Sequence, residues 1–404
     1  MKYCGIDWAN DHHDALSIDE QGRHLGSIRV AHTPEGFSQL DAYLEHIAGP
    51  DGTDQVACII ETTHGLLIAH LLEQGWAVYP VNPRTVARRR APSGAKTDTI
   101  DAYLLAKTGR ADFQDLRRLN PDSELIQELK TLTRDQDSLV QMQTRLVNQL
   151  TACLKAYYPV ALDLFGKLQQ PSTLAFLRAY PTVQAARAAS VEDLTTLLKP
   201  LRFPGAKKKA EELVNHLQQP SLVASEVITR AKSRLMLALV AQLEPLLKQI
   251  DEYDQEIERL FLSHADSELF LSLPGAGARL APRLLAEMGD DRDRYESASS
   301  LQALAGTSPV LYQSGTYQKA HRRLGCIKPW RNALYQFADR SRRWEAWAGE
   351  YYRGKRTEGK SHTVAVRALA NIWARILLAV WKKRELYQTA TFEAAQRTHA
   401  WRVA

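Results

Sequence analysis

Four carboxylates stand where the chain would have to compensate their charge. Asp7 lies in the first β-rich run, and Glu61 closes the short apolar run 56–60. Asp98 and Asp101 are three residues apart at an expected helix start, so they share one helical face. A carboxylate in or at the end of a buried strand is costly unless it is compensated, commonly by a divalent cation. Oxygen ligands of this kind favour Mg²⁺, or Mn²⁺, over zinc.

Each acid also has an ordinary structural explanation when it is taken singly. Asp98 could cap the helix N-terminus, Asp101 could be a first-turn acid that the helix dipole favours, and Asp7 could be a turn residue. The order of the elements that carry the acids therefore decides between the two explanations.

The hydrophobic pattern predicts those elements. Three β-rich runs separated by polar or glycine turns, at 2–7, 14–19 and 24–31, predict a meander. Further elements are expected as a helix from Pro34 to about Gly49, a buried strand at 56–60, a helix at 66–73, a strand at 76–81 and a helix at 98–107. This order is that of a ribonuclease-H-like fold, whose acids converge on two Mg²⁺ ions about 4 Å apart that clamp a phosphodiester.

The remainder of the chain is predicted to be mostly helical. Leucines near heptad spacing, with no Pro or Gly between them, predict a long helix at about 122–156, and a second is expected at about 226–262. The C-terminal part is expected to contain helices at 278–288, about 328–353 and 361–384, with a Gly- and Ser-bearing stretch at 305–316. We predict three parts: an α/β domain at 1–120, a helical coiled-coil arm with inserted helices at 121–265, and a mostly helical domain at 266–404.

Composition and charge point to a soluble protein that binds a polyanion. Of 404 residues 45% are apolar, and no apolar run approaches the roughly 20 residues that cross a bilayer. The N-terminus does not resemble a signal peptide, so we expect a cytoplasmic protein without a membrane. Its four cysteines lack zinc or disulfide spacing. Residues 301–404 carry 19 Lys and Arg against 6 Asp and Glu, which makes nucleic acid the expected partner.

Five strings carry a more specific signal: GIDWAN, CIIET, KTDTIDA, LPGAG and AGTSPVLYQSG, in that order. Together they resemble the transposases of insertion-sequence family 110, the DEDD recombinases with a RuvC-like N-terminal domain. The resemblance spans about 1–155 and 265–385. It implies that Asp7, Glu61, Asp98 and Asp101 bind Mg²⁺, and that Ser314, in the SG dipeptide, is the nucleophile of a covalent phosphoserine mechanism. It also implies donor and target DNA, a structured bridge RNA and assembly as dimers to tetramers.

Without the resemblance, Ser314 would be read as a turn residue before Gly315, and Ser300 and Ser308 would be equally eligible. A serine hydroxyl needs activation and a neutralised phosphate, which metal ions held by four carboxylates could supply. The segment 159–225 is longer than expected for compact family members.

Other residues are candidates for binding nucleic acid. LPGAG before a helix resembles a helix-hairpin-helix element, in which Gly275 and Gly277 would let backbone N–H groups approach a DNA phosphate, although a plain glycine turn is the alternative. The basic candidates are Arg88, Arg89, Arg90, Lys96, Lys319, Arg322, Arg323, Lys328 and Arg331. A solvated charge run is an equal alternative for the three consecutive arginines.

Two rival functions remain at this point. A RuvC-like nuclease would use the same metal set but attack with water, which leaves Ser314 structural. An actin-like nucleotide-binding fold also carries GID on its first strand, but it favours a glycine soon afterwards, where this chain has Trp8-Ala9-Asn10. His12-His13 is expected to be a surface pair, with a metal-binding role as the alternative. The leucine spacing of the arm leads us to expect that it mediates dimerisation.

Overall fold

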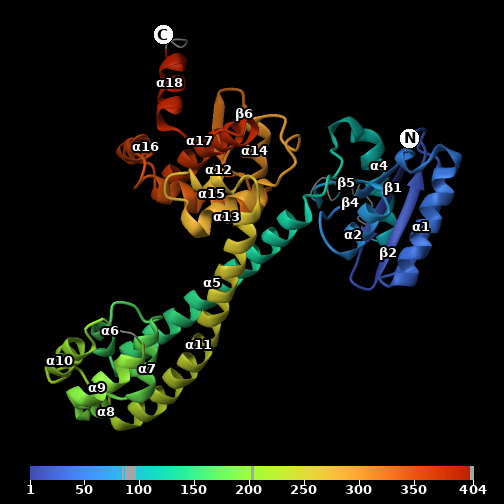
Figure 1. Cartoon of the computed structure of the whole chain (residues 1–404). Coiled ribbons are helices and arrows are strands. Elements are labelled where there is room, and N and C mark those ends of the chain that lie inside the picture. The colour runs from blue at the N-terminus through green and yellow to red at the C-terminus, as the bar shows by residue number, and fades with distance from the viewer. Residues whose placement is uncertain (84–85, 87–96, 202–203, 401–404) are drawn as a thin grey trace. The chain divides into compact units, whose positions relative to one another are not determined.

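The computed structural model describes residues 1–83, 86, 97–201 and 204–400 (Figure 1). Contacts divide the chain into two compact units, Met1–Pro121 and Asp122–Ala404. The predicted DNA-binding residues Arg88, Arg89, Arg90 and Lys96 lie outside the described residues.

The first unit is a mixed five-stranded sheet with helices on both faces. It consists of β1 (Lys2–Trp8), β2 (His12–Ile18), β3 (His24–Ala31), α1 (Pro34–Ala48), β4 (Val56–Ile60), α2 (Leu66–Glu73), β5 (Ala77–Pro80) and α4 (Asp98–Asp112). The strand order is β3-β2-β1-β4-β5, with β1 antiparallel to β2 and parallel to β4. The predicted meander and element order are confirmed, although β2 begins two residues earlier and α4 ends five residues later than expected. The architecture is consistent with a ribonuclease-H-like domain.

Alternation along the strands decides which helix covers which face. Cys4 and Ile6 of β1 belong to one core with α1 and α2, whereas Tyr3 belongs to another with Leu105 of α4. Between Tyr3 and Asp7, Gly5 lies directly beneath the α4 backbone at Ala102. Alternate residues of β1, ending at Asp7, therefore face α4.

Two long helices, α5 (Glu124–Tyr157) and α11 (Glu226–Ser263), pack side by side in the second unit (Figure 1). Between them in sequence lie α6 (Ala161–Leu164), α7 (Pro171–Ala179), α8 (Val183–Ala188), α9 (Val191–Leu198) and α10 (Ala206–Leu217). One core joins these short helices to the last turns of α5 and the first half of α11. A second core joins the opposite ends of α5 and α11 to the C-terminal helices. The predicted pair of long helices is confirmed.

The C-terminal region is mostly helical, as predicted. Its elements are α12 (Ser267–Leu271), α13 (Gly277–Met288), α14 (Ala298–Leu304), β6 (Val310–Ser314), β7 (Tyr317–His321), α15 (Lys328–Ser341), α16 (Ala346–Thr357), α17 (His362–Lys383) and α18 (Thr389–Ala400). The prediction of a single helix at 328–353 is wrong, because the chain turns after Ser341 and α15 and α16 are separate helices. A Cβ at Gly349 would lie 2.8 Å from the Arg342 carbonyl oxygen, so this glycine permits the close return.

Among the described helices, α17 is the one long and apolar enough by length and composition to cross a membrane. Its residues Trp373, Leu377 and Trp381 are buried in the C-terminal core. This packing accounts for the apolar character of α17 within a folded domain.

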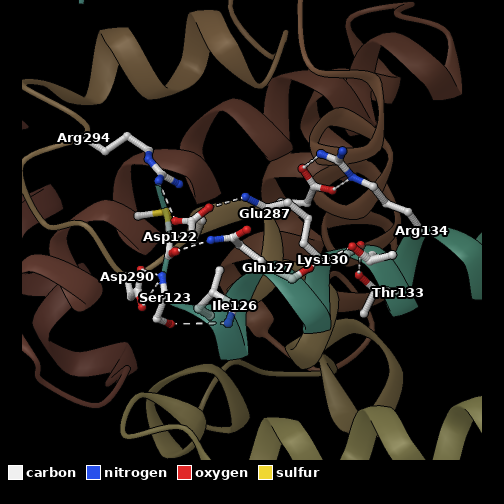
Figure 2. A network of polar contacts seen from close by, with 12 residues as sticks. Asp122, Ser123, Ile126, Gln127, Lys130, Thr133, Arg134, Glu287, Asp290 and Arg294 are labelled. Carbon is white, nitrogen blue, oxygen red and sulfur yellow. Dashed lines mark hydrogen bonds and ion pairs between the residues drawn. The ribbon is translucent and has the colours of Figure 1, made fainter. Parts of the chain in front are cut away.

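A polar network built on the buried carboxylates of Asp122 and Glu287 fixes the start of α5 on the C-terminal helices (Figure 2). The Asp122 carboxylate accepts a hydrogen bond from Lys130 Nζ at 2.5 Å and pairs with Arg294 Nη2 at 2.5 Å. Arg134 binds both oxygens of Glu287 in α13, at 2.7 and 2.9 Å. These contacts make the first turns of α5 part of the same rigid packing as α13.

We expect Asp122→Asn to lower the free energy of unfolding at pH 7 by about 1–3 kcal/mol, because two cations lose their shared carboxylate. Burial would raise the pKa of Asp122, but Lys130 and Arg294 outweigh it and lower that pKa below its ordinary 3.8. The stabilisation is therefore present above about pH 4 and is lost as the pH falls through the lowered pKa. Urea unfolding at several pH values measures this, with the exposed Asp135→Asn in the same helix as control. If the difference in unfolding free energy between wild type and Asp122→Asn stays constant into strong acid, the Asp122 carboxylate is not the source of the stabilisation.

Candidate active site

The four predicted acids come from three elements that meet on one face of the first sheet. Asp7 is the last of the alternate β1 residues that face α4. Glu61 directly follows β4 and lies two residues after Ile59, whose side chain packs in the same core as α4. Asp98 and Asp101 occupy the first turn of α4 itself. The sheet and the helix that covers it thus present the acids toward a shared region.

The electrostatics of Asp7 reveal how closely these acids lie. Burial, followed by the charges of Asp101, Asp98, Glu61 and Asp14, raises the pKa of Asp7 from 3.8 to about 6. The charges of the neighbouring carboxylates repel the ionised form of Asp7, and a divalent cation with oxygen ligands relieves that repulsion. The donor set therefore fits Mg²⁺ or Mn²⁺.

The single-residue explanations fit less well. The N-cap of α4 is Thr97, whose hydroxyl accepts a hydrogen bond from the Ile100 N–H at 3.2 Å, so Asp98 is not needed as a cap. Asp101 is only 3% exposed, unlike a solvated first-turn acid. Asp7 lies within β1 and is paired with Asp14, so it is not a turn residue.

Three further polar residues, Asp14, Arg29 and His12, lie beside the acids, and none of them was among the predicted site residues. Asp7, Asp14 and Arg29 lie directly opposite one another across β1, β2 and β3. Arg29 Nε donates to both oxygens of Asp14, at 3.2 and 3.0 Å, and its Nη2 donates to Asp98 Oδ2 at 3.2 Å. His12 Nε2 also lies 3.2 Å from Asp98 Oδ2, and this contact raises the pKa of His12.

The expected surface pair His12-His13 is therefore wrong. His13 is fully buried, and burial together with the charges of His32 and His12 lowers its pKa to about 4. His12 instead faces the acids, and the ligand atoms of His12, Asp14 and Asp98 all lie within 4.8 Å of one another. The alternation of side chains along β2 could have predicted this placement, since residues 12 and 14 lie on the same face of the strand.

Ser314 lies at the tip of an exposed hairpin in the second unit. It ends β6 and pairs with Tyr317, which begins β7. Gly315 between them has a φ of 57°, which glycine adopts without strain in a two-residue hairpin loop. Within the described part of the chain, no partner is found for the Ser314 hydroxyl.

The stretch bearing glycine and serine, for which the sequence predicts no strands, forms this hairpin. Almost every residue of β6 and β7 is exposed, including Tyr312 and Tyr317 at 59% and 57%. A two-stranded hairpin is at best marginally stable alone in water, and this one leaves both tyrosine side chains exposed to solvent. Four of the five C-terminal basic candidates are on β7 or in the following segment to the start of α15, namely Lys319, Arg322, Arg323 and Lys328, and Arg331 follows in α15.

The LPGAG segment turns the chain between α12 and α13. Gly275 and Gly277 have φ values of 81° and 58°, so both positions require glycine. A Cβ at Gly275 would lie 2.7 Å from the Trp344 ring, whereas Gly277 has open space around it and begins a helix without a side-chain cap. Of the two, Gly277 is the position that a ligand could approach.

The fold is consistent with a ribonuclease-H-like domain whose acid set fits a divalent cation, and comparisons with known proteins specify the family. A model of DEDD transposases of IS110 type, described as a transposase, matches residues 4–159. A model described as the transposase IS116/IS110/IS902 family matches residues 267–353.

Relatives match over nearly the whole chain. The IS117 mini-circle protein of Streptomyces coelicolor is 34% identical over 91% of both chains. The 42 kDa protein of insertion element IS900 of Mycobacterium paratuberculosis is 29% identical over 97% of this chain and 98% of its own. The 44.8 kDa protein of IS116 from Streptomyces clavuligerus is 28% identical over 96% of both.

The chain belongs to the IS110 family of DEDD transposases. Membership implies phosphoryl transfer on DNA, DNA binding and a divalent metal. The predicted family is thereby confirmed.

Proposed function

We propose that this chain is the recombinase of an insertion sequence, which cleaves and rejoins DNA by a serine mechanism. The observation that carries the proposal is the convergence of Asp7, Glu61, Asp98 and Asp101 on one face, together with an exposed serine in the other unit. Divalent metal held by the acids would neutralise the scissile phosphate and the charge that develops there.

The chain's own nucleophile completes the exchange. A bond forms between Ser314 Oγ and phosphorus while one phosphorus–oxygen bond to a sugar breaks, and the serine proton ends on the released sugar hydroxyl. The phosphoserine ester conserves the bond for rejoining. Exposure at a hairpin tip supports Ser314 over Ser300, whose hydroxyl lies 3.0 Å from the Ser297 hydroxyl.

We propose that DNA and a structured bridge RNA contact the basic C-terminal residues and the hairpin. The exposed tyrosines would stack on unpaired bases while Lys319, Arg322 and Arg323 hold phosphates. The three working parts would be the metal domain at 1–120, the arm at 121–265 and the nucleophile domain at 266–404. A site divided between two domains can be composed from two copies of the chain.

Exposed apolar side chains on the first half of α11 support assembly into dimers or tetramers. Val227, Ile228 and Leu235 are 64%, 44% and 45% exposed. We expect light scattering of a dilution series, with and without nucleic acid, to detect a dimer or larger species. Monomer alone at every concentration would refute assembly through the arm.

A denaturing gel tests the serine mechanism. Purified protein, Mg²⁺, the element's ends and RNA transcribed from its flanking non-coding region should give a DNA-linked protein band. That band should disappear in Ser314→Ala and in Asp7→Ala and persist in Ser300→Ala. Cleavage that survives Ser314→Ala but not Asp7→Ala would instead identify a nuclease that attacks with water.

A further inference from the structure

Asp98 is held through one of its two oxygens by residues of the neighbouring strands. Arg29 Nη2 and His12 Nε2 both lie 3.2 Å from Asp98 Oδ2, and no contact to Oδ1 is found among the described residues. A carboxylate restrained through one oxygen keeps the other available in a fixed direction. Partners of this kind orient metal-binding carboxylates and strengthen binding.

The Arg29 guanidinium is itself held in place. Asp14 binds it through three contacts, Nε to both carboxylate oxygens and Nη2 to Oδ2 at 2.9 Å. The side chain of Asp14 is only 9% exposed, and its position directly opposite Arg29 is set by the β2–β3 register. The fork geometry of arginine lets one side chain bind Asp14 and Asp98 together, which a lysine cannot reproduce.

The same contacts argue against a separate cation site at His12, Asp14 and Asp98. These three side chains have ligand atoms close enough for a metal. Arg29 Nη2, however, already lies 2.9 Å from the Asp14 oxygen and 3.2 Å from the Asp98 oxygen. A permanently charged guanidinium between two oxygens takes the place of a metal ion there.

We infer that Arg29, oriented by Asp14 and assisted by His12, is a positioning residue that orients Asp98 for metal binding. The inference rests on the proposed function only in taking Asp98 as a metal ligand. It adds Asp14 and Arg29, which lie opposite Asp7 on the next two strands, to the four acids of the family. Arg29 acts through Asp98 and is assigned no contact with DNA.

Mn²⁺ binding to the full-length protein without nucleic acid tests this directly. Titration followed by electron paramagnetic resonance should show a dissociation constant about 10–100-fold higher in Arg29→Ala, as expected when an outer partner of a ligand is lost. Arg29→Lys should give an intermediate value, and Asp14→Asn should weaken binding in the same direction. Arg23→Ala is the matched control, because Arg23 is an exposed cation of the same β2–β3 hairpin paired with Asp19.

A second readout separates positioning from contact with DNA. The Mg²⁺ concentration for half-maximal cleavage should rise in Arg29→Ala, while cleavage at saturating Mg²⁺ returns to within a few fold of wild type. Unchanged Mn²⁺ affinity, or tighter binding, would overturn the inference. If His12→Ala binds one Mn²⁺ fewer per protein than wild type, the inference is also overturned, because His12 would then be a metal ligand.

The failure of the proposed function has a different signature. If Asp7→Asn and Asp101→Asn bind Mn²⁺ as wild type does, the acids are not the metal site, whatever Arg29 does. Circular dichroism of each variant checks its fold. Should Arg29→Ala fail to fold, Arg29→Lys and Asp14→Asn provide the same comparison.

Discussion

Replacing Asp101 with asparagine should abolish metal-dependent cleavage and, at the same time, make the metal-free protein more stable. Asp101 is 3% exposed on α4, and after burial its charge has the largest effect in raising the pKa of Asp7. Asparagine has nearly the same shape but removes one of the crowded negative charges. The two expected effects have opposite signs because the acids are arranged for a cation rather than for stability.

Both effects can be measured on the same preparation. If the metal supplies about 4 kcal/mol of charge stabilisation in the transition state, losing it lowers the cleavage rate about 10³-fold. In EDTA, relief of about 1 kcal/mol of repulsion should raise the melting temperature of a domain of this size by roughly 4 °C.

Asp115→Asn is the control for this prediction, because Asp115 is exposed just beyond the end of α4. It should change neither the rate nor the melting temperature. An Asp101→Asn variant that melts at a lower temperature in EDTA would show instead that the Asp101 carboxylate stabilises the fold.

The N-terminal domain was predictable because its signals are local. Period-two runs, a continuous apolar strand and a Thr-Pro helix start are each contained in a few residues, and the chain folds them as read. The convergence of the acids followed from their order, since the carboxyl ends of β1 and β4 lie side by side in a parallel pair. The proposal of Ser314 as the nucleophile rests on resemblance, because a serine before glycine has no chemical signature of its own.

The partners of Asp98 were not predictable in this way. Arg29 meets Asp14 because of the register of two antiparallel strands, and both meet Asp98 because α4 packs on that face. Register and packing distance are properties of the folded sheet, and residue types alone do not reveal them.

The C-terminal errors have a related cause. The hairpin at β6 and β7 is exposed on both faces, so it lacks the alternation of buried and exposed residues that marks a strand. The break between α15 and α16 contains neither proline nor glycine, and the glycine that permits it, Gly349, lies within the following helix.

Gly5→Ala should lower both stability and metal binding, because it pushes α4 away from β1, and these two elements together carry three of the four acids. The added Cβ would overlap the backbone carbonyl of Ala102 and the backbone N–H of Ala106, neither of which can rotate away. Either α4 moves outward or the strand distorts, and overpacking of this kind costs about 1–3 kcal/mol, occasionally more.

The displacement should reach the metal site as well as the stability. Asp7 is two residues from Gly5, and Asp98 and Asp101 are on the helix that must move. A shift of about 1 Å between reacting groups can cost about 10²-fold in rate. We therefore expect thermal unfolding at a lower temperature together with weaker Mn²⁺ binding and slower cleavage.

Two other glycines serve as graded controls for this prediction. A Cβ at Gly109, also in α4, would meet the side chain of Ile59 rather than backbone, so Gly109→Ala should cost less. Gly166→Ala adds a methyl group to open space between α6 and α7 and should change neither the melting temperature nor the Mn²⁺ affinity. If Gly5→Ala has the same melting temperature and Mn²⁺ affinity as Gly166→Ala, then α4 does not pack on β1 as described. The convergence of the four acids would then lose its structural basis.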